Sequence, residues 1–257
     1  TMSVNDGSSD NDFDAVADQT VTATTTDDDT AGFTVAETGG STAVAESGTT
    51  DTFTVVLDAQ PTSDVVMSVS SADTGEATVT STLTFTPLNW DTPQTVTVTG
   101  IDDNIIDGTV SSTITINVID AISDDDFDSV ADQTVSATTT DDDTAGFTIV
   151  ESGGSTSVSE SGTTDTFTVV LDAQPTSDVV LDISSSDTGE ATVTSTLTFT
   201  SANWDTPQTV TVTGVDDNII DGTISSTITV SVNDGNSDND FDAVADQTVT
   251  ATTTDDD

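Results

Sequence analysis

Small polar and β-branched apolar residues alternate along most of the chain with a period of two. Clear examples are Thr95-Val96-Thr97-Val98-Thr99 and Ser112-Thr113-Ile114-Thr115-Ile116. Successive side chains of a strand point to opposite faces of a sheet, so this alternation predicts strands with one buried face. In the first half of the chain it predicts strands at 42–46, 52–57, 64–70, 76–86 with an interruption, 94–100, 111–118 and 133–139.

The whole pattern repeats along the chain. Asp27 to Asp29 recur as Asp141 to Asp143 and as Asp255 to Asp257, which gives a period of 114 residues. Self-similarity of this kind indicates a tandem array of structural units. The sequence therefore predicts the C-terminal part of a preceding repeat at 1–29, followed by complete repeats at 30–143 and 144–257.

Short strands separated by turn residues define the expected fold class. Seven strands in one repeat favour an immunoglobulin-like Greek-key sandwich. The large core side chains would be Phe33, Phe53, Phe85, Trp90 and Phe127. We expect an all-β protein made of tandem immunoglobulin-like β-sandwiches of about seven strands.

Charge changes this picture, because the chain has 48 Asp and Glu residues and no Lys, Arg or His. Nucleic acid and anionic membranes, which are bound through Lys and Arg, are excluded as electrostatic partners. No stretch approaches the roughly 18 apolar residues of a membrane-spanning helix. With no Cys and no His, any bound metal must be a hard cation held by oxygen.

The acids gather in three short segments of each repeat, whereas a merely solubilising surface would scatter them over outward strand positions. The first segment is the loop Gly100–Gly108, which carries the side chains of Asp103 and Asp107 with the carbonyl of Ile105 between them. The corresponding residues of the second repeat are Asp217, Ile219 and Asp221. Calcium accepts six to eight oxygen ligands in irregular loop geometry, so the pattern favours calcium over magnesium.

The second segment has acids at relative positions 1, 3, 5 and 9, like half of an EF-hand loop. It lacks the glycine at position 6 and the glutamate at position 12 of that loop. A separate calcium loop is therefore the hypothesis here. Its residues are Asp124, Asp126, Asp128 and Asp132, then Asp238, Asp240, Asp242 and Asp246, and in the leading segment Asp10, Asp12, Asp14 and Asp18.

The third segment is a run of three aspartates where one sandwich ends and the next begins. Adjacent carboxylates repel one another, so the run would push two sandwiches apart unless a cation bridges it. The members are Asp27, Asp28 and Asp29, then Asp141, Asp142 and Asp143, and finally Asp255, Asp256 and Asp257.

A strand followed by Asp-Asp-Asp and Ala-Gly-Phe, together with an Asp-Asp-x-Ile-x-Asp loop, resembles the Calx-β domain. The resemblance spans nearly the whole repeat and implies a seven-stranded sandwich with calcium at one end. The ligands it implies are Glu46, Asp73, Asp103, Asp107 and Asp141 to Asp143, and in the second repeat Glu160, Asp187, Asp217, Asp221 and Asp255 to Asp257, with Glu37 and Glu151 as junction ligands. This chain departs from the family at Asn104 and Gly108, where acids are common, and in the Asp124–Asp132 segment.

That extra segment, the lack of cysteine and the phrases Leu83-Thr84-Phe85-Thr86 and Asn89-Trp90-Asp91-Thr92-Pro93-Gln94 resemble repeats of giant bacterial surface proteins, the type I secreted adhesins of the repeats-in-toxin kind. The resemblance implies calcium-stiffened extender modules outside the cell that project a distal binding domain.

Several functions stay open at this point. An extender would contact only neighbouring repeats, whereas a self-associating subunit of a filament, biofilm matrix or surface layer would contact other copies. Threonine ladders such as Thr95, Thr97 and Thr99 could bind a ligand, although Thr is also an ordinary outward strand residue. An enzyme is not expected, because a catalytic site is seldom duplicated with its whole scaffold and only 21 of 114 positions differ between the repeats.

Overall fold

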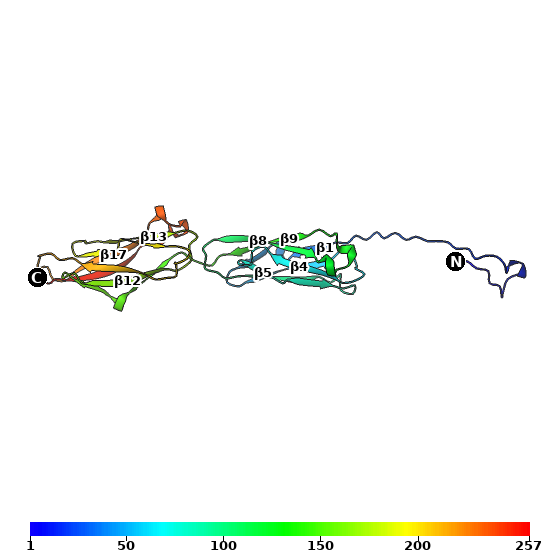
Figure 1. The fold of residues 1–257 in the computed structure, drawn as a ribbon, viewed down its shortest axis with the longest axis horizontal. Helices are drawn as coiled ribbons and strands as arrows, with labels where there is room; N and C mark the ends of the chain where they lie inside the picture. Colours follow the sequence, from blue (N-terminus) through cyan, green and yellow to red (C-terminus); the bar gives the residue numbers. More distant parts are fainter.

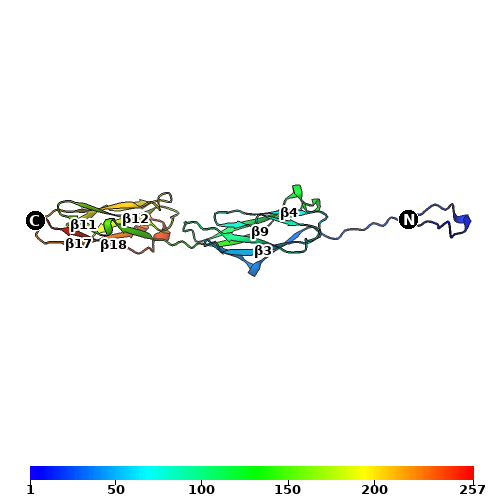
Figure 2. The same ribbon diagram turned by 90° about the horizontal axis from the view of Figure 1, so that it is seen from below.

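The computed structural model describes residues 1–257 and contains two β-sandwiches arranged end to end, preceded by an extended segment (Figure 1). The view turned by 90° has the same elongated outline, so the molecule is a rod rather than a plate (Figure 2). The all-β, immunoglobulin-like sandwich fold expected from the alternation is confirmed. No helix of the length and apolar character needed to cross a membrane occurs in it.

Each sandwich has nine strands in two sheets. In the first, a sheet with the order β1-β3-β7-β5 faces a sheet with the order β2-β9-β8-β4-β6. The strands are β1 (Phe33–Glu37), β2 (Thr42–Ala45), β3 (Thr50–Leu57), β4 (Val65–Ser71), β5 (Ala77–Val79), β6 (Thr82–Phe85), β7 (Gln94–Gly100), β8 (Thr109–Val118) and β9 (Gln133–Thr140).

The second sandwich repeats this topology strand for strand, with sheets β10-β12-β16-β14 and β11-β18-β17-β13-β15. Its strands are β10 (Phe147–Glu151), β11 (Thr156–Ser159), β12 (Thr164–Leu171), β13 (Val179–Ser185), β14 (Ala191–Val193), β15 (Thr196–Phe199), β16 (Gln208–Gly214), β17 (Ile224–Val232) and β18 (Gln247–Thr254).

Two places where the chain changes sheets explain why nine strands replace the predicted seven. The interrupted strand expected at 76–86 is β5 and β6, which pair with β7 and β4 in opposite sheets. Strand β1 was not predicted. It lies in the sheet opposite β2, and the chain crosses between them at Gly39 and Gly40, whose φ angles of 75° and 85° favour glycine.

The cores use the inward positions of the alternating pattern. Phe33, Phe53, Phe85 and Phe127 are buried as predicted, and Trp90 packs against them partly buried. Outward strand positions are mainly Thr and Ser. Most charged residues lie in the loops at the two ends of each sandwich, and those on strands are Glu37, Asp51, Glu151, Asp165 and Asp182.

Residues 1–29 nearly match residues 229–257 in sequence but form no strand. Val21 is 74% exposed, whereas its counterpart Val249 in β18 is 4% exposed. β18 lies between β17 and β11, and the leading segment has no such neighbours with which to pair. A local turn and one antiparallel bridge are shared: short 3₁₀ turns occur at Asn11–Phe13, Asp125–Phe127 and Asn239–Phe241, and Met2 pairs with Gln19 as Val230 pairs with Gln247.

Candidate metal centre

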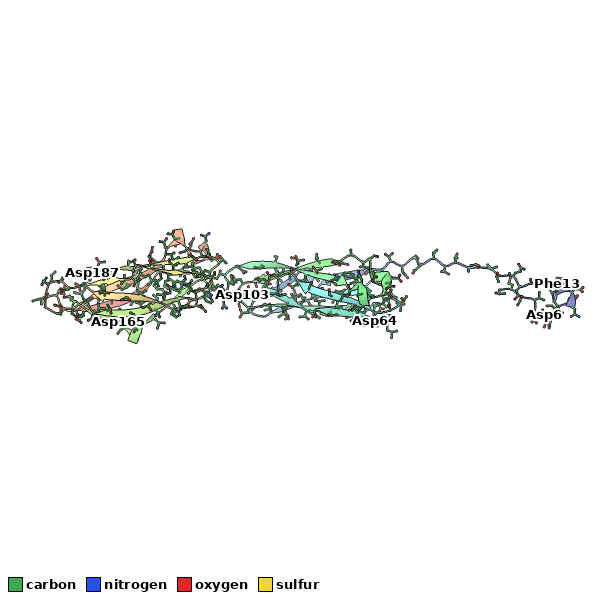
Figure 3. All side chains as sticks on the ribbon, in the orientation of Figure 1. Asp6, Phe13, Asp64, Asp103, Asp165 and Asp187 are labelled. Atoms are coloured by element: carbon green, nitrogen blue, oxygen red, sulfur yellow. The ribbon has the colours of Figure 1, made fainter.

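The loops that follow β2, β4, β7 and β9 meet at the C-terminal end of the first sandwich. Strand β2 pairs in parallel with β9, so the two strands end together at Ala45 and Thr140. Figure 3 places Asp103 where the two sandwiches meet, and Asp64 at the opposite end of the first one. The candidate site therefore lies at the junction.

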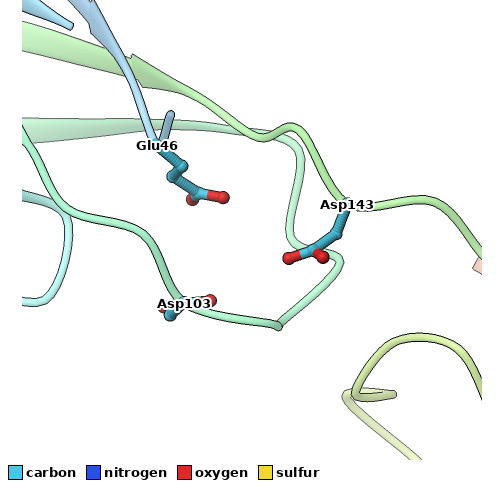
Figure 4. A group of neighbouring side chains, drawn as sticks. All are labelled: Glu46, Asp103 and Asp143. Atoms are coloured by element: carbon cyan, nitrogen blue, oxygen red, sulfur yellow. The ribbon is translucent and has the colours of Figure 1, made fainter. Parts of the chain in front are cut away.

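Two groups of carboxylates form this site in the first sandwich. Glu46, Asp103 and Asp143 have oxygens within 4.8 Å of one another, and so do Glu46, Glu76 and Asp107. Figure 4 shows the first group, with the three carboxylates converging from three separate segments. Glu46 belongs to both groups and links them.

The second sandwich has a related construction, in which Asp255 replaces the counterpart of Asp103. Its groups are Glu160 with Glu190 and Asp221, and Glu160 with Asp255 and Asp257. Two oxygens on one calcium ion, each 2.3 to 2.6 Å from it, lie at most about 5 Å apart. The spacing of both pairs of groups therefore fits a shared cation of this size.

The glutamates of these groups are buried without partners. Glu46 is 1% exposed and Glu76 is 5% exposed, and the Oε2 atom of each accepts no hydrogen bond. In the second sandwich both carboxylate oxygens of Glu160 and Oε2 of Glu190 are likewise unpaired. A buried carboxylate without a partner is costly, and a cation ligated by hard oxygens removes that cost.

The pKa values show the same unfavourable burial of negative charge. Burial, followed by the charges of Asp141 and Asp103, raises the pKa of Glu46 to about 7, and burial with the charge of Asp255 does the same for Glu160. Burial also raises the pKa of Glu76, Asp107 and Asp143. Like charges held in one low-dielectric place disfavour ionisation, and a divalent cation reverses that effect.

Tight backbone packing brings the ligand loops together. The Glu46 amide donates to the Thr140 carbonyl at 3.1 Å, and the Ile101 amide donates to the Glu76 carbonyl at 2.9 Å. Gly100 lies so close to β2 that a Cβ atom there would be 2.1 Å from the Ala45 carbonyl oxygen. Only glycine allows the acidic loop to leave β7 beside Glu46.

Asp141 acts mainly as a clamp on the acidic loop. Its Oδ2 accepts the amides of Asp107 at 3.1 Å and Gly108 at 2.9 Å, and its Oδ1 accepts the Asp143 amide at 2.7 Å. Asp255 makes the equivalent bonds to the second loop. In the first sandwich Asp141 thus holds the loop while Asp143 faces the site, and in the second Asp255 does both beside Asp257.

Glu76 and Glu190 are members of the site that the sequence interpretation missed. The chain contains only six glutamates, and four of them, at equivalent positions of the two repeats, belong to the carboxylate groups. The rarity of glutamate in an aspartate-rich chain was the sequence signal that could have identified Glu76 and Glu190. Asp73, which the family resemblance suggested instead, is exposed and accepts the Gly75 amide at 3.0 Å, and Asp187 does the same with Gly189.

The other predicted ligands at this end lie beside the groups rather than in them. Asp142 and Asp256 are exposed, and Asp217 accepts the Ile219 amide at 2.7 Å, as Asp103 accepts that of Ile105. The Ile105 and Ile219 carbonyls take part in no backbone hydrogen bond of the protein. Glu37 and Glu151 each accept a hydrogen bond from a threonine, Thr42 and Thr156.

The second acidic segment lies at the opposite end of each sandwich and does not form such a group. Asp124 is buried, and its Oδ2 accepts the amides of Thr62 at 2.6 Å and Ser63 at 2.7 Å as well as the Thr62 hydroxyl at 2.8 Å. Its Oδ1 accepts the Asp126 amide. Asp238 has the equivalent partners, while Asp126, Asp128, Asp132, Asp240, Asp242 and Asp246 are exposed.

Replacing Asp124 by alanine should destabilise the first sandwich by roughly 2–4 kcal/mol with or without calcium, because several buried donors lose a charged acceptor. Backbone donation from Ser63, with the other bonds, lowers the pKa of Asp124 from 3.8 to about 2. The stabilisation is therefore present above about pH 4 and lost as the pH falls through 2. Chemical denaturation measures it, and exposed Asp125→Ala, the matched control, should have little effect.

The leading segment keeps only local contacts. Asp10 accepts the Asp12 amide and Asp27 accepts the Asp29 amide, as in the complete repeats. Asp10, Asp12, Asp14, Asp18 and Asp27 to Asp29 are exposed and join no carboxylate group. Residues 1–29 contain no counterpart of Glu46, Glu76, Asp103 or Asp107 to complete a site.

No family model matches the chain, and no curated protein does. Solved structures with a similar arrangement include CBD12 from CALX1.2, with 14% identity, a TM-score of 0.32 and coverage of 77% of this chain and 79% of that one. Domains 4 and 5 of the S-layer protein SbsC give 16% identity, a TM-score of 0.35, and coverage of 86% and 97%. At these values the Calx-β likeness stays a resemblance, and the carboxylate groups themselves carry the case for a metal centre.

Proposed function

We propose that each sandwich binds calcium at its C-terminal end and that the chain serves as a calcium-stiffened extender in an extracellular bacterial surface or matrix protein. The observation that carries the proposal is the pair of buried glutamates in each sandwich, Glu46 with Glu76 and Glu160 with Glu190, whose unpaired oxygens face further carboxylates. The chain has no Lys, Arg or His side chain that could neutralise them.

The position of the site supports a mechanical role. The ligands of the first site come from segments that also connect the two sandwiches, since Asp143 belongs to the linker that leads into β10. A cation there ties the linker to the body of the first sandwich. Extracellular calcium modules with dissociation constants of about 10⁻⁴ to 10⁻³ M bind calcium outside the cell and lose it at the low calcium concentration of the cytosol.

A scattering experiment tests this role. In calcium, small-angle X-ray scattering of the whole chain should give the profile of an extended rod like that in Figure 1. In chelator, the unscreened carboxylates at the junction should loosen the linker and broaden the distribution of distances. Identical profiles in the two conditions would contradict the extender role.

A second candidate is a self-associating subunit of a filament, matrix or surface layer. It is supported by the edge strands of both sheets, β1, β5, β2 and β6 in the first sandwich, whose outer backbone groups could pair laterally between copies. Light scattering in calcium over a range of protein concentrations separates the two, because a tether keeps a constant mass and an assembling subunit does not. A catalytic role is not proposed, since the carboxylates are engaged at structural junctions.

A further inference from the structure

The tip of the acidic loop, Asn104 to Ile106, reaches across the junction and contacts the second sandwich. The Gln174 amide donates to the Asn104 carbonyl at 2.7 Å, and the Ile106 amide donates to the Gln174 carbonyl at 3.3 Å. Ile105 and Gln174 thereby form a parallel β-bridge. These are backbone bonds between two sandwiches that otherwise have separate cores.

Ile106 adds an apolar contact to this bridge. It belongs by sequence to the first sandwich but packs against the core of the second, and it lines a small hollow together with Ala145, Ala243 and Val244. The equivalent residue of the second repeat, Ile220, has the same neighbours in sequence and is 81% exposed. The burial of Ile106 is therefore due to docking and not to the loop itself.

The docking tip and the metal ligands are parts of one short loop. Asp103, which faces Glu46 and Asp143, accepts the Ile105 amide at 2.7 Å, and Asp107, which faces Glu76, follows Ile106 directly. The clamp from Asp141 fixes the far side of the tip through Asp107 and Gly108. A cation that draws Asp103 and Asp107 inward therefore also sets the position of Ile106.

We infer that Ile106 is the anchor through which calcium binding in one sandwich fixes the orientation of the next. Its docking surface is the N-terminal end of the following sandwich, around Gln174. The inference rests on the proposed calcium function and adds the surface that transmits it. Calcium would order the loop, and the ordered loop would hold Ile106 against the second sandwich. The β-bridge to Gln174 would then fix the position of the loop relative to that sandwich. Ile106 is a positioning residue and ligates nothing itself.

Pulsed dipolar spectroscopy tests the inference on the whole chain. The chain has no cysteine, so Thr113→Cys and Thr227→Cys, on exposed mid-strand positions, carry one spin label in each sandwich. In calcium the distance distribution between the labels should be narrow, and in chelator it should be broad. With Ile106→Ser the distance distribution should stay broad in calcium. With Ile220→Ser, the same change at the loop of the second sandwich, calcium should still narrow the distribution.

A second pair of variants probes the receiving surface. Ala243→Asp, in the hollow that Ile106 enters, should also lose the narrowing, whereas Ser129→Asp, at the equivalent position of the first sandwich, should keep it. Thermal melting and calorimetric calcium titration accompany each variant. Both should match the unsubstituted chain, which excludes a folding or metal-binding defect as the cause.

The outcomes separate the two proposals. If the unsubstituted chain binds no calcium, the proposed function fails and this inference fails with it. In a second outcome, calcium binds and narrows the distance distribution equally in the unsubstituted chain, in Ile106→Ser and in Ala243→Asp. That result overturns the inference and leaves the proposed function standing. Loss of narrowing in both variants, with retained calcium binding and unchanged controls, supports it.

Discussion

Calcium at 100 times its dissociation constant should raise the melting temperature of the sandwiches by roughly 10 to 20 °C over the protein in chelator. A ligand at that excess adds about 2.7 kcal/mol per site to folding, and one kcal/mol shifts the melting of a domain of about 100 residues by about 4 to 8 °C. The chain has no Lys, Arg or His to offset its 48 acids, so a stabilising cation must come from the solution.

Differential scanning calorimetry measures this shift, and magnesium provides the control. Magnesium requires near-octahedral geometry and gives up its water reluctantly, so it should produce a smaller shift at equal concentration. Equal shifts for both cations would indicate general screening of the acidic surface. No shift with either would contradict a structural metal centre.

Replacing Glu46 and Glu160 by glutamine should remove most of that calcium-dependent shift and should stabilise the chelated protein. Each of these glutamates belongs to both carboxylate groups of its sandwich, so one change affects both. Without metal, the substitution replaces a carboxylate that resists ionisation in its buried place by a neutral amide. The variant should therefore melt above the unsubstituted chain in chelator and below it in calcium.

The pH dependence of the chelated protein depends on the same residue. Burial raises the pKa of Glu46 from 4.5 to about 7, so the folded state holds a proton that the unfolded state has released. Stability in chelator should fall as the pH rises from about 4.5 to 7, and the glutamine variant should lose part of this slope, because the raised pKa values of Glu76, Asp107 and Asp143 remain. Glu37→Gln with Glu151→Gln, at exposed or partly exposed positions outside the groups, is the matched control and should retain it.

Much of the fold is encoded in local patterns that can be read from the sequence. Alternation located the strands that became β3, β7, β8 and β9, because half-buried strands impose a period of two. It missed β1, whose five residues are short and whose place is set by pairing with β3. Residues 19–26 show the same limit of local patterns, because their sequence is identical to that of β18, and only β18, with strands on both sides, forms a strand.

The site was predictable in its location but less so in its membership. Asp103, Asp107 and Asp143 are close in sequence to obvious acidic runs, and Glu46 was found through the family resemblance. Glu76 stands alone among small residues, and only the meeting of four loops gives it partners. Asp124 was the reverse case: its spacing suggested a metal loop, yet its oxygens are used by backbone amides, which no spacing rule distinguishes from a ligand.

The carboxylates therefore have three separate structural tasks. Glu46 and Glu76 with Asp103, Asp107 and Asp143 form the candidate metal centre, Asp141 clamps the loop, and Asp124 fixes the opposite end. The separation matters for function, since the centre lies at the junction where a cation can affect both stability and orientation. The exposed Thr and Ser faces of the sheets take no part in it.

Calorimetric titration of the whole chain with calcium, beside the double variant Glu46→Gln with Glu160→Gln, is the most direct test of the metal centre. The unsubstituted chain should show saturable binding to both sandwiches in physiological salt, and the variant should lose it. Equal heats from both proteins, or a response abolished by salt alone, would contradict a site built on the buried glutamates.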